Sequence, residues 1–589
     1  MNQILKSHWR LLAIAVGLSA ALLGFHYITG TPQGASFHYN LSWFEGFRNA
    51  FWQGDLYPRF VPDLWYGMGG TDFYFYGPLP FWFASIFGEA TCPGCSTSQV
   101  FSISAAWMLI FAGVSFFIFA RRYFSPAWAG FGAILYVLLP VHYLVTWFVA
   151  QTIGTILAVA ILPLFALATT RLIEENRGGW LFAACLTALA LSHLPTTLII
   201  LHLLGLFVVC AAGLRAETWR GAITLMMRFV PWGLLGIALS AFYWLPALAL
   251  LDTVSSDMLY SDYYDATKWL LLDGLPENNP IETLWFKWAL ILAVTTAIGA
   301  GSILYRRGQI SSLLLWIIVP TLFTAFLMTI FSYPIWKYWI INKVQFPYRT
   351  LVVADFSIAL AAIVIVRNLL ANRLGAHAMR ARMIAGFSAL TLAFAYINPV
   401  SQSADVTVRG WGQTDEFLPV APPEYIPREM MQLTLMAFRA RVTDDDNNAD
   451  RYLIFFEEMQ LAYDAAQTAF AQDAPGATLT PQINDRMRLN VDLPGAASVR
   501  LPVASWQFWR AERADGTPVP LMTNAELGVL EIALPAGPSS VQLYLVETMP
   551  QKIGSWISLI TLLGLLIGVA GLLFRAKVSV DKPLATSIR

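Results

Sequence analysis

Charged residues are scarce in this chain. Only 13% of its 589 residues are Asp, Glu, Lys or Arg, and the formal net charge is zero. A chain with so little charge of either sign has no overall basic character that would favour nucleic acid. The sequence also lacks a Walker-type phosphate loop, a dinucleotide-binding glycine pattern and zinc-type Cys/His spacing. These absences leave the membrane as the place where any chemistry would occur.

Cysteine is scarce as well, with four residues in the chain. Cys185 and Cys210 lie in long apolar runs and are expected to be small buried side chains. Cys92 and Cys95 form a Cys-Pro-Gly-Cys sequence, for which a local disulfide, a redox site and a free pair or metal site are the alternatives. No thioredoxin-like pattern surrounds this pair, so the sequence favours a structural disulfide.

Apolar residues are abundant, at 57% of the chain, and the mean hydropathy is +0.57. Apolar runs of about 17–22 residues are long enough to cross a bilayer as helices. The sequence therefore predicts an all-α polytopic membrane domain with about twelve spans. The predicted spans are 11–29, 101–120, 127–146, 153–170, 179–194, 196–214, 229–250, 284–304, 311–331, 350–366, 383–398 and 553–574.

Basic residues indicate how these spans are oriented. Lys6 and Arg10 precede the first span, Arg121 follows the second, and similar clusters recur at every second connection until Arg575 and Lys577. Cytoplasmic loops carry such an excess of Lys and Arg. Both termini are thus predicted to be cytoplasmic. Because no small-residue cleavage site follows the first apolar run, we expect a retained anchor and not a cleaved signal peptide.

The first predicted outside loop, 30–100, has an unusual composition. Nineteen aromatic residues lie in 36–87, together with six charges: Glu45, Arg48, Asp55, Arg59, Asp63 and Asp72. Rings with polar neighbours suit a membrane–water interface. As a helix, 38–53 would place Trp43, Phe44 and Phe47 on one stripe. The loop is therefore predicted to lie against the membrane domain and to build a site for a lipid-borne substrate.

A second composition begins after the membrane domain, which we assign to 1–398. Residues 399–552 are more charged and have no long apolar run, and their alternating segments predict a β-sandwich-like α+β domain outside the membrane. The last span and a cytoplasmic tail occupy 553–589. The expected helices are 424–440 and 449–472, and the expected strands lie in 487–499, 517–522 and 528–534.

Five polar residues at outer span ends or in outside loops are candidate substrate-binding groups. Arg59 lies in a rigid Tyr-Pro-Arg-Phe sequence, and Arg349 lies at the outer mouth of a span, where the positive-inside rule disfavours arginine. A lipid phosphate explains such an arginine, although an ion pair with Asp55 or Asp63 is the alternative for Arg59. We expect His38, Arg59, His193, Asp252 and Arg349 to converge on one cavity open to lipid.

The outside loop 251–283 is acidic. Carboxylates in such number are able to bind a divalent cation, but an acidic outside loop also complements cytoplasmic basic loops. The second interpretation is favoured for all of them except Asp252, and no metal-ligand set is assigned. The acidic residues are Asp252, Asp257, Asp262, Asp265 and Asp273.

Several short motifs occur in an order that resembles a known family. They are His38, GDLYPRF at 54–60, GMGG at 67–70, FYFYGPL at 73–79, SHLP at 192–195, LSAFYWLPAL at 239–248, QFPYR at 345–349 and EYIP at 424–427. In these motifs the chain resembles bacterial membrane proteins labelled "6-pyruvoyl-tetrahydropterin synthase-related", which are polytopic and similar to GT-C-type glycosyltransferases. The resemblance spans most of the chain.

The resemblance implies an acidic residue in the first loop that acts as a base or metal contact. Members often carry an aspartate shortly before the histidine, but residues 34–37 here are Gly-Ala-Ser-Phe. Either Glu45, Asp55 or another carboxylate takes this catalytic role, or transfer activity has been lost. The implied activity is transfer of a sugar from a polyprenyl-phosphate carrier at the outer face of a bacterial inner membrane.

Two other functions stay open. A non-catalytic scaffold or assembly protein in envelope polysaccharide biogenesis, with envelope-biogenesis proteins as partners, would fit the missing acids. A transporter of lipid-linked substrates is less favoured, because charges within the predicted spans are nearly absent and no inverted repeat is evident.

The topology is directly testable. A phosphatase reporter that is active only outside the cytoplasm, fused after residue 480, should be active, since 399–552 is predicted to lie outside. A cytoplasm-specific reporter at the same position should be silent. The reverse pattern would refute the predicted orientation.

Overall fold

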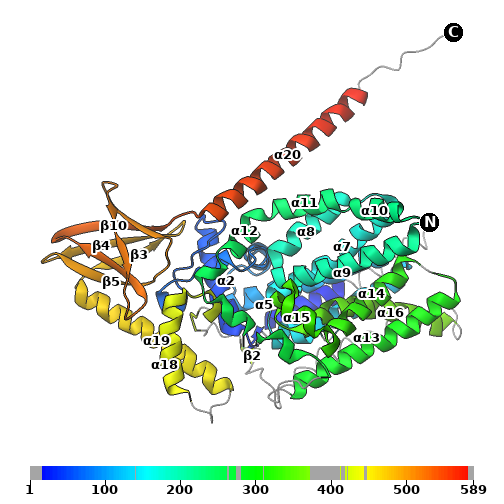
Figure 1. Ribbon diagram of the computed structural model, residues 1–589, viewed down its shortest axis with the longest axis horizontal. Helices are drawn as coiled ribbons and strands as arrows, with labels where there is room; N and C mark the ends of the chain where they lie inside the picture. The colour runs from blue at the N-terminus through cyan, green and yellow to red at the C-terminus, as the bar shows by residue number, and fades with distance from the viewer. Residues whose placement is uncertain are drawn as a thin grey trace, which may run out of the picture.

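The computed structural model is a helical bundle with a β domain at one end (Figure 1). Most bundle helices run roughly along the long axis of the molecule, and the last helix, α20, leaves the junction with the β domain at an angle to them. The structure describes residues 16–28, 30–139, 141–261, 264–272, 280–309, 311–371, 411–412, 418–420, 422–442 and 448–580.

Seven helices in the described part of the chain are long and apolar enough to cross a membrane. An eighth span is possible if α6 and η4, which meet at 47°, are counted as one. The helices of the bundle are α5 (Thr97–Ala120), α6 (Pro126–Leu138), η4 (Val141–Val149), α7 (Ile153–Glu175), α8 (Gly179–Ser192), α9 (Leu194–Arg215), α10 (Trp219–Met227), α11 (Val230–Leu239), α12 (Ala241–Ala249), α13 (Pro280–Arg306), α14 (Ser312–Leu327), α15 (Tyr333–Tyr338), α16 (Leu351–Ala371) and α20 (Met549–Val580).

The predicted number of twelve spans is not confirmed. Helices occur at eleven of the predicted positions, but Val16–Ile28, α8 and α14 are shorter than a full span. The predicted span 229–250 is divided at Ser240, where α11 ends and α12 begins, and the membrane-length helix covers Trp219–Leu239. The predicted span 383–398 lies outside the described residues.

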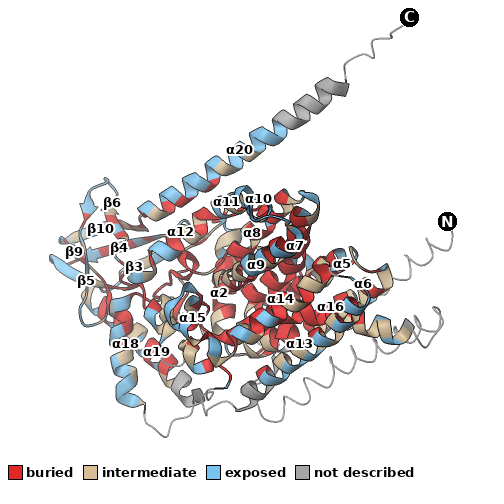
Figure 2. Ribbon diagram, turned by 45° about the vertical axis from the view of Figure 1, so that its right-hand side comes forward, coloured by how far each residue is buried: buried red, intermediate tan, exposed pale blue. Residues whose placement is uncertain are grey.

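The bundle is built around α7, and α20 lies at its periphery. In the most apolar stretch of α7, 89% of the residues are buried, against 11% for α20 (Figure 2). The exposed apolar side chains of α20 fit a helix that lipid surrounds. Gly554 brings α20 against the backbone of Ala241 at the start of α12, because a side chain there would meet the carbonyl oxygen of Ala241.

The β domain consists of two antiparallel sheets. One has the strand order β3-β4-β10-β6-β7 and the other the order β5-β9-β8. Strict alternation of exposed and buried residues along β4 directs Met487, Leu489 and Val491 into the core between the sheets. The strands are β3 (Thr478–Gln482), β4 (Arg486–Leu493), β5 (Ala497–Ala504), β6 (Trp509–Arg513), β7 (Pro518–Val519), β8 (Leu521–Thr523), β9 (Val529–Leu534) and β10 (Gly537–Leu545).

Two helices, α18 (Arg428–Arg441) and α19 (Asn448–Asp473), precede these strands and lie beside the sheets (Figure 1). They begin and end within four residues of the helices expected from the sequence at 424–440 and 449–472. Arg500 of β5 forms an ion pair with Asp473 at the end of α19, with 2.7 Å between Nε and Oδ2. This contact joins the helical part of the domain to its smaller sheet.

The aromatic first loop packs against the helical bundle, as the sequence predicted, and much of it is buried. Its helix α2 (Phe37–Trp52) carries Trp43, Phe44 and Phe47, whose side chains are almost completely buried against Phe73, Phe81 and Phe101. These rings also contact the first turns of α5, through Phe101, and the segment before α18, through Tyr425. The burial of this aromatic stripe is therefore shared between the loop, the bundle and the segment before α18.

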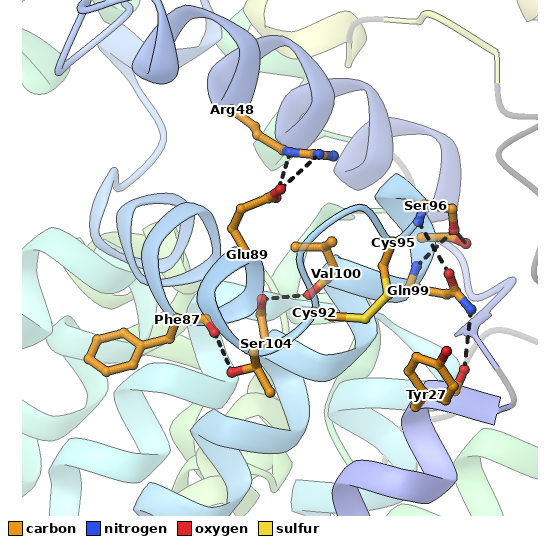
Figure 3. Close-up of a disulfide and its surroundings, with 12 residues drawn as sticks. Tyr27, Arg48, Phe87, Glu89, Cys92, Cys95, Ser96, Gln99, Val100 and Ser104 are labelled. Carbon is orange, nitrogen blue, oxygen red and sulfur yellow. Dashed lines mark hydrogen bonds and ion pairs between the residues drawn. A yellow bond between two sulfur atoms is a disulfide. The ribbon is translucent and has the colours of Figure 1, made fainter.

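The disulfide expected between Cys92 and Cys95 is present in the structure, with 5.5 Å between the Cα atoms (Figure 3). It closes the turn between α4 (Glu89–Thr91) and α5, whose first residues are held by a capping box of Ser96 and Gln99. Glu89, just before this turn, forms an ion pair with Arg48 of α2 at 2.9 Å. The turn therefore helps to seat α2 on the bundle.

Mass spectrometry tests the disulfide. After alkylation of protein purified without reductant, Cys92 and Cys95 should stay unmodified, because the outside compartment is oxidising. Cys210 should be alkylated once the protein is denatured, which controls for reagent access. Alkylation of Cys92 and Cys95 in the denatured, unreduced protein would exclude the bond.

Candidate functional site

Asp72, an acid of the aromatic first loop, has a completely buried side chain. The indole Nε1 of Trp43 donates a hydrogen bond to its Oδ1 at 2.9 Å, and its Oδ2 is buried without a partner in the described structure. Burial raises the pKa of Asp72 to about 7, while the Trp43 hydrogen bond acts in the opposite direction. Such a carboxyl group is poised to exchange a proton near neutral pH.

The turn that holds Asp72 depends on two glycines. Gly69 has a φ of +81°, which favours glycine, and Gly70 forms a bridge with Val61 through hydrogen bonds of 2.9 and 3.0 Å. A side chain on Gly70 would overlap the carboxylate of Asp72. The GMGG motif therefore makes the space in which this carboxylate lies.

Glu424 is a second acid near this turn, half-buried and contributed by the segment before α18. The ring of its neighbour Tyr425 stacks on Phe75 at 5.6 Å and lies 6.2 Å from Trp43. These ring contacts place Glu424 beside the segment that carries Asp72. Burial, and secondarily the nearby charge of Asp72, raises the pKa of Glu424 to about 7, whereas the charge of Arg349 opposes the rise.

The segment 418–427 that delivers Glu424 is tied across the first loop by backbone contacts. The amide of Leu418 donates to His38 Nδ1 at 3.0 Å, and its carbonyl accepts from Ser42 Oγ at 2.7 Å. The amide of Tyr66 donates to the carbonyl of Pro419 at 2.7 Å. Glu424 is consequently fixed by elements that are more than 350 residues away in the sequence.

Arg349 supplies the positive charge of the site. It lies on the turn η11 (Pro347–Thr350), and its guanidinium donates to the carbonyl of Val344 at 2.9 Å and to Gln345 Oε1 at 2.8 Å. Its charge acts on Glu424, Tyr76, His193 and Tyr260. Among the described residues it has no ion-pair partner within 4.0 Å, so donor groups remain for an anion.

His193 completes the site from the start of α9. Its Nδ1 accepts a hydrogen bond from the amide of Thr196 at 3.3 Å and contacts the hydroxyl of Thr196 at 2.8 Å. An accepting Nδ1 leaves the proton on Nε2. The imidazole therefore has one N–H to donate.

We call Asp72, His193, Arg349 and Glu424 the acid–arginine cluster. With both acids ionised it would carry one net negative charge, and with one proton on either acid it is neutral. Within the described part of the chain, no three His, Cys, Asp or Glu side chains are grouped to hold a metal ion. Asp262 and Asp273 of the acidic loop lie outside the described residues.

Two of the five predicted binding residues, His193 and Arg349, thus come together. Arg59 lies elsewhere, in a second group with Asp55 and Asp485 at the junction with the β domain. Its guanidinium donates to the carbonyl of Phe242 at 3.2 Å and lies 4.8 Å from the centre of the Tyr57 ring. Burial raises the pKa of Asp485 to about 7, and the charge of Arg59 opposes this.

The other predicted residues lie outside this cluster. His38 accepts a hydrogen bond from the amide of Leu418, and Asp252 is exposed. Of the two predicted catalytic acids, Glu45 accepts hydrogen bonds from Thr97 and Asn49, and Asp55 accepts from the amide of Tyr57 at 3.2 Å. The expectation that His38, Arg59 and Asp252 share one cavity with His193 and Arg349 is therefore replaced by a cluster containing Asp72 and Glu424.

No protein-family model matches the sequence, and no curated protein matches it. Among solved structures, the chain is similar to the mycobacterial arabinofuranosyltransferase AftD at 14% identity with a TM-score of 0.41, over 92% of this chain but 40% of that one. It is similar to ArnT from Cupriavidus metallidurans in the apo state (12%, TM-score 0.27, 63% of this chain and 81% of that one) and bound to undecaprenyl phosphate (10%, 0.29, 90% and 97%). At these TM-scores the similarities carry no argument about activity, which has to be argued from the residues.

The raised pKa values of Asp72 and Glu424 predict a pH-dependent stability. Between the ordinary carboxyl pKa, about 4, and about 7, the folded chain holds protons that the unfolded chain releases, so rising pH destabilises it. The melting temperature in detergent should fall between pH 5 and pH 8. Asp72→Asn and Glu424→Gln should each flatten this slope, whereas Asp252→Asn, at an exposed acid, should not. An identical slope in all four proteins would contradict the assignment.

Proposed function

We propose that this chain is a GT-C-like membrane glycosyltransferase that takes its sugar from a polyprenyl-phosphate carrier at the outer face of a bacterial inner membrane. The observation that carries the proposal is the acid–arginine cluster, in which Glu424 lies in the field of both Asp72 and Arg349. Asp72 has a carboxylate oxygen without a partner, and Arg349 has no ion pair in the described structure. Transfer from a lipid phosphate needs a base for the acceptor and a cation for the leaving group. The cluster offers both.

The reaction assigns a separate role to each group. The acceptor hydroxyl oxygen attacks the anomeric carbon, and its proton passes to the carboxylate of Asp72. The bond between that carbon and the phosphate oxygen breaks with its electron pair on the oxygen, which leaves as polyprenyl phosphate. Arg349 stabilises the phosphate, and His193 Nε2–H donates a further hydrogen bond to it. Holding these groups together also raises the reaction rate, because the reacting groups meet already oriented.

Glu424 has a supporting role beside Asp72. The two acids and the arginine carry at most one net negative charge. A proton shared between the acids removes this charge, so that the neutral cluster does not repel a phosphodiester of charge −1. After the acceptor proton arrives at Asp72, Glu424, which lies in the field of Asp72, takes the proton onward. Asp72 and Glu424 therefore take the roles that the sequence had offered to Glu45 and Asp55.

The other candidate functions lose their specific support. A scaffold was suggested by the missing acids before His38, and Asp72 supplies an acid in the same loop. Transport was considered for a lipid-linked substrate, but the polar groups gather at the side of the bundle where the β domain attaches, next to Phe75 and Tyr425, which pack on the β-domain core. Such a location suits chemistry at one membrane face.

Purified protein incubated with a panel of polyprenyl-phosphate sugars and glycan acceptors should release polyprenyl phosphate. Asp72→Asn should lower the rate by a factor of about 10²–10⁴, the contribution expected of a general base. Arg349→Ala should weaken donor binding more than Arg349→Lys. The matched controls Glu45→Gln and Asp55→Asn, which change acids of the same loop outside the cluster, should retain activity. Full activity in Asp72→Asn would refute the proposal.

A further inference from the structure

Lys343 is a cation on the outer surface close to the acid–arginine cluster. It lies on the turn η10 (Ile340–Val344), and its ammonium is 3.6 Å from the centre of the Tyr260 ring. The residue is exposed, and in the described structure it has no carboxylate within 4.0 Å. Burial of the ammonium lowers the pKa of Lys343, while the more distant charges of Asp252 and Asp257 raise it. A cation resting on a ring is available to an incoming anion.

The chain just before Lys343 presents large apolar side chains to the outside. Phe331, Tyr338 and Trp339 are 72%, 78% and 59% exposed. They lie between the membrane helices α14 and α16, together with Lys337, whose ammonium contacts the hydroxyl of Tyr333 at 3.1 Å. Exposed aromatic side chains alternating with lysines are typical of the headgroup level of a bilayer. We call residues 331–343 the entry lip.

Tyr260 connects the entry lip to the buried cluster. Its phenol is influenced by the charges of Arg349 and Glu424, while its ring face carries the ammonium of Lys343. Lys343, which is exposed, and Arg349, which is half-buried, therefore lie near the same tyrosine. Gln345, between them in sequence, bonds both Arg349 and the carbonyl of Leu259 next to Tyr260. Gln345 thereby ties the turn that carries Arg349 to the segment that carries Tyr260.

We infer that Lys343 and Tyr260 form an outer binding site for the phosphate of a lipid-linked substrate, which the phosphate occupies before it reaches Arg349. This inference rests on the proposed function, since it names the route by which the donor enters that site. The ammonium is a compact, mobile point charge, so it can leave the ring and follow a phosphate. Release of polyprenyl phosphate after transfer would use the same site in reverse.

The lipid source of the phosphate follows from the surroundings of Lys343. A free phosphate ion would gain nothing from Phe331, Tyr338 and Trp339, whereas a polyprenyl chain would lie along them. Asp252, an exposed acid on the solvent side, repels free anions that arrive from water, whereas Asp257 is paired with Arg428. An anion whose tail is anchored in the bilayer approaches from the entry lip and avoids Asp252.

Binding to the full-length protein in phosphatidylcholine nanodiscs tests this site without requiring transfer. The probes are undecaprenyl phosphate, the uncharged undecaprenol and inorganic phosphate. Lys343→Gln should weaken undecaprenyl phosphate binding about tenfold and slow its association, because the first cation is lost. Lys343→Arg should restore most of the affinity. Lys337→Gln, which removes the other exposed lysine of the lip, is the matched control and should bind like the native protein.

The outcomes separate the outer site from the proposed function. If Arg349→Gln weakens binding but Lys343→Gln leaves affinity and association rate unchanged, the outer site is refuted and the buried site stands. If Lys343→Gln weakens binding and Arg349→Gln does not, the proposed role of Arg349 fails. If Lys337→Gln and Lys343→Gln lost affinity for undecaprenyl phosphate equally, general surface charge would explain the loss, and the outer site would be refuted. A Lys343-dependent affinity for inorganic phosphate as strong as that for the lipid would overturn the lipid source.

Discussion

The hydrogen bond from Trp43 to Asp72 is the interaction on which the rest of the site depends. A buried carboxyl group is costly unless it is protonated, paired or hydrogen-bonded, and in the described structure this one has a single donor, at 2.9 Å. The glycines at 69 and 70 make room for the group, and the segment 418–427 covers it. Asp72 is thereby held fully buried, with its Oδ2 unpartnered in the described structure and its pKa raised to about 7.

The same stretch of chain couples the membrane domain to the β domain. Tyr74 packs on Trp506 at 4.8 Å, and Phe60 packs on Trp509 at 5.0 Å. Two residues beyond Tyr74, Tyr76 lies in the field of Arg349 and Glu424. Residues 72–76 therefore lie between two polar clusters. Arg59 and Asp485 are on the side of the β domain, and the acid–arginine cluster is on the other side.

Much of the architecture could be predicted from the sequence, because hydropathy and alternation are local properties. The helices α18 and α19 and the strands β4 and β9 lie close to where periodicity indicated them. The division of 229–250 at Ser240 was missed because the apolar run continues through it. The contacts of Trp43 with Tyr425 and of Phe44 with Phe101 of α5 were not predicted, because these partners lie far away in the sequence.

The site was predictable in part. Arg349 was detectable because it opposes the positive-inside rule, and His193 because it ends a helix before proline. Asp72 had only the signal of an acid between GMGG and four aromatic residues, and Glu424 only its place in EYIP. Their roles follow from burial and from contacts spanning more than 350 residues, which no local pattern records. Glu45 and Asp55 were closer to His38 in sequence, but the fold directs them to other partners.

The most direct test is an experimental structure of the full-length protein in nanodiscs with undecaprenyl phosphate. The account predicts phosphate density within hydrogen-bonding distance of the Arg349 guanidinium and His193 Nε2, with Asp72 Oδ2 facing the open side of that phosphate. Phosphate density at Arg59, at the β-domain junction, with the acid–arginine cluster unchanged and closed, would contradict it.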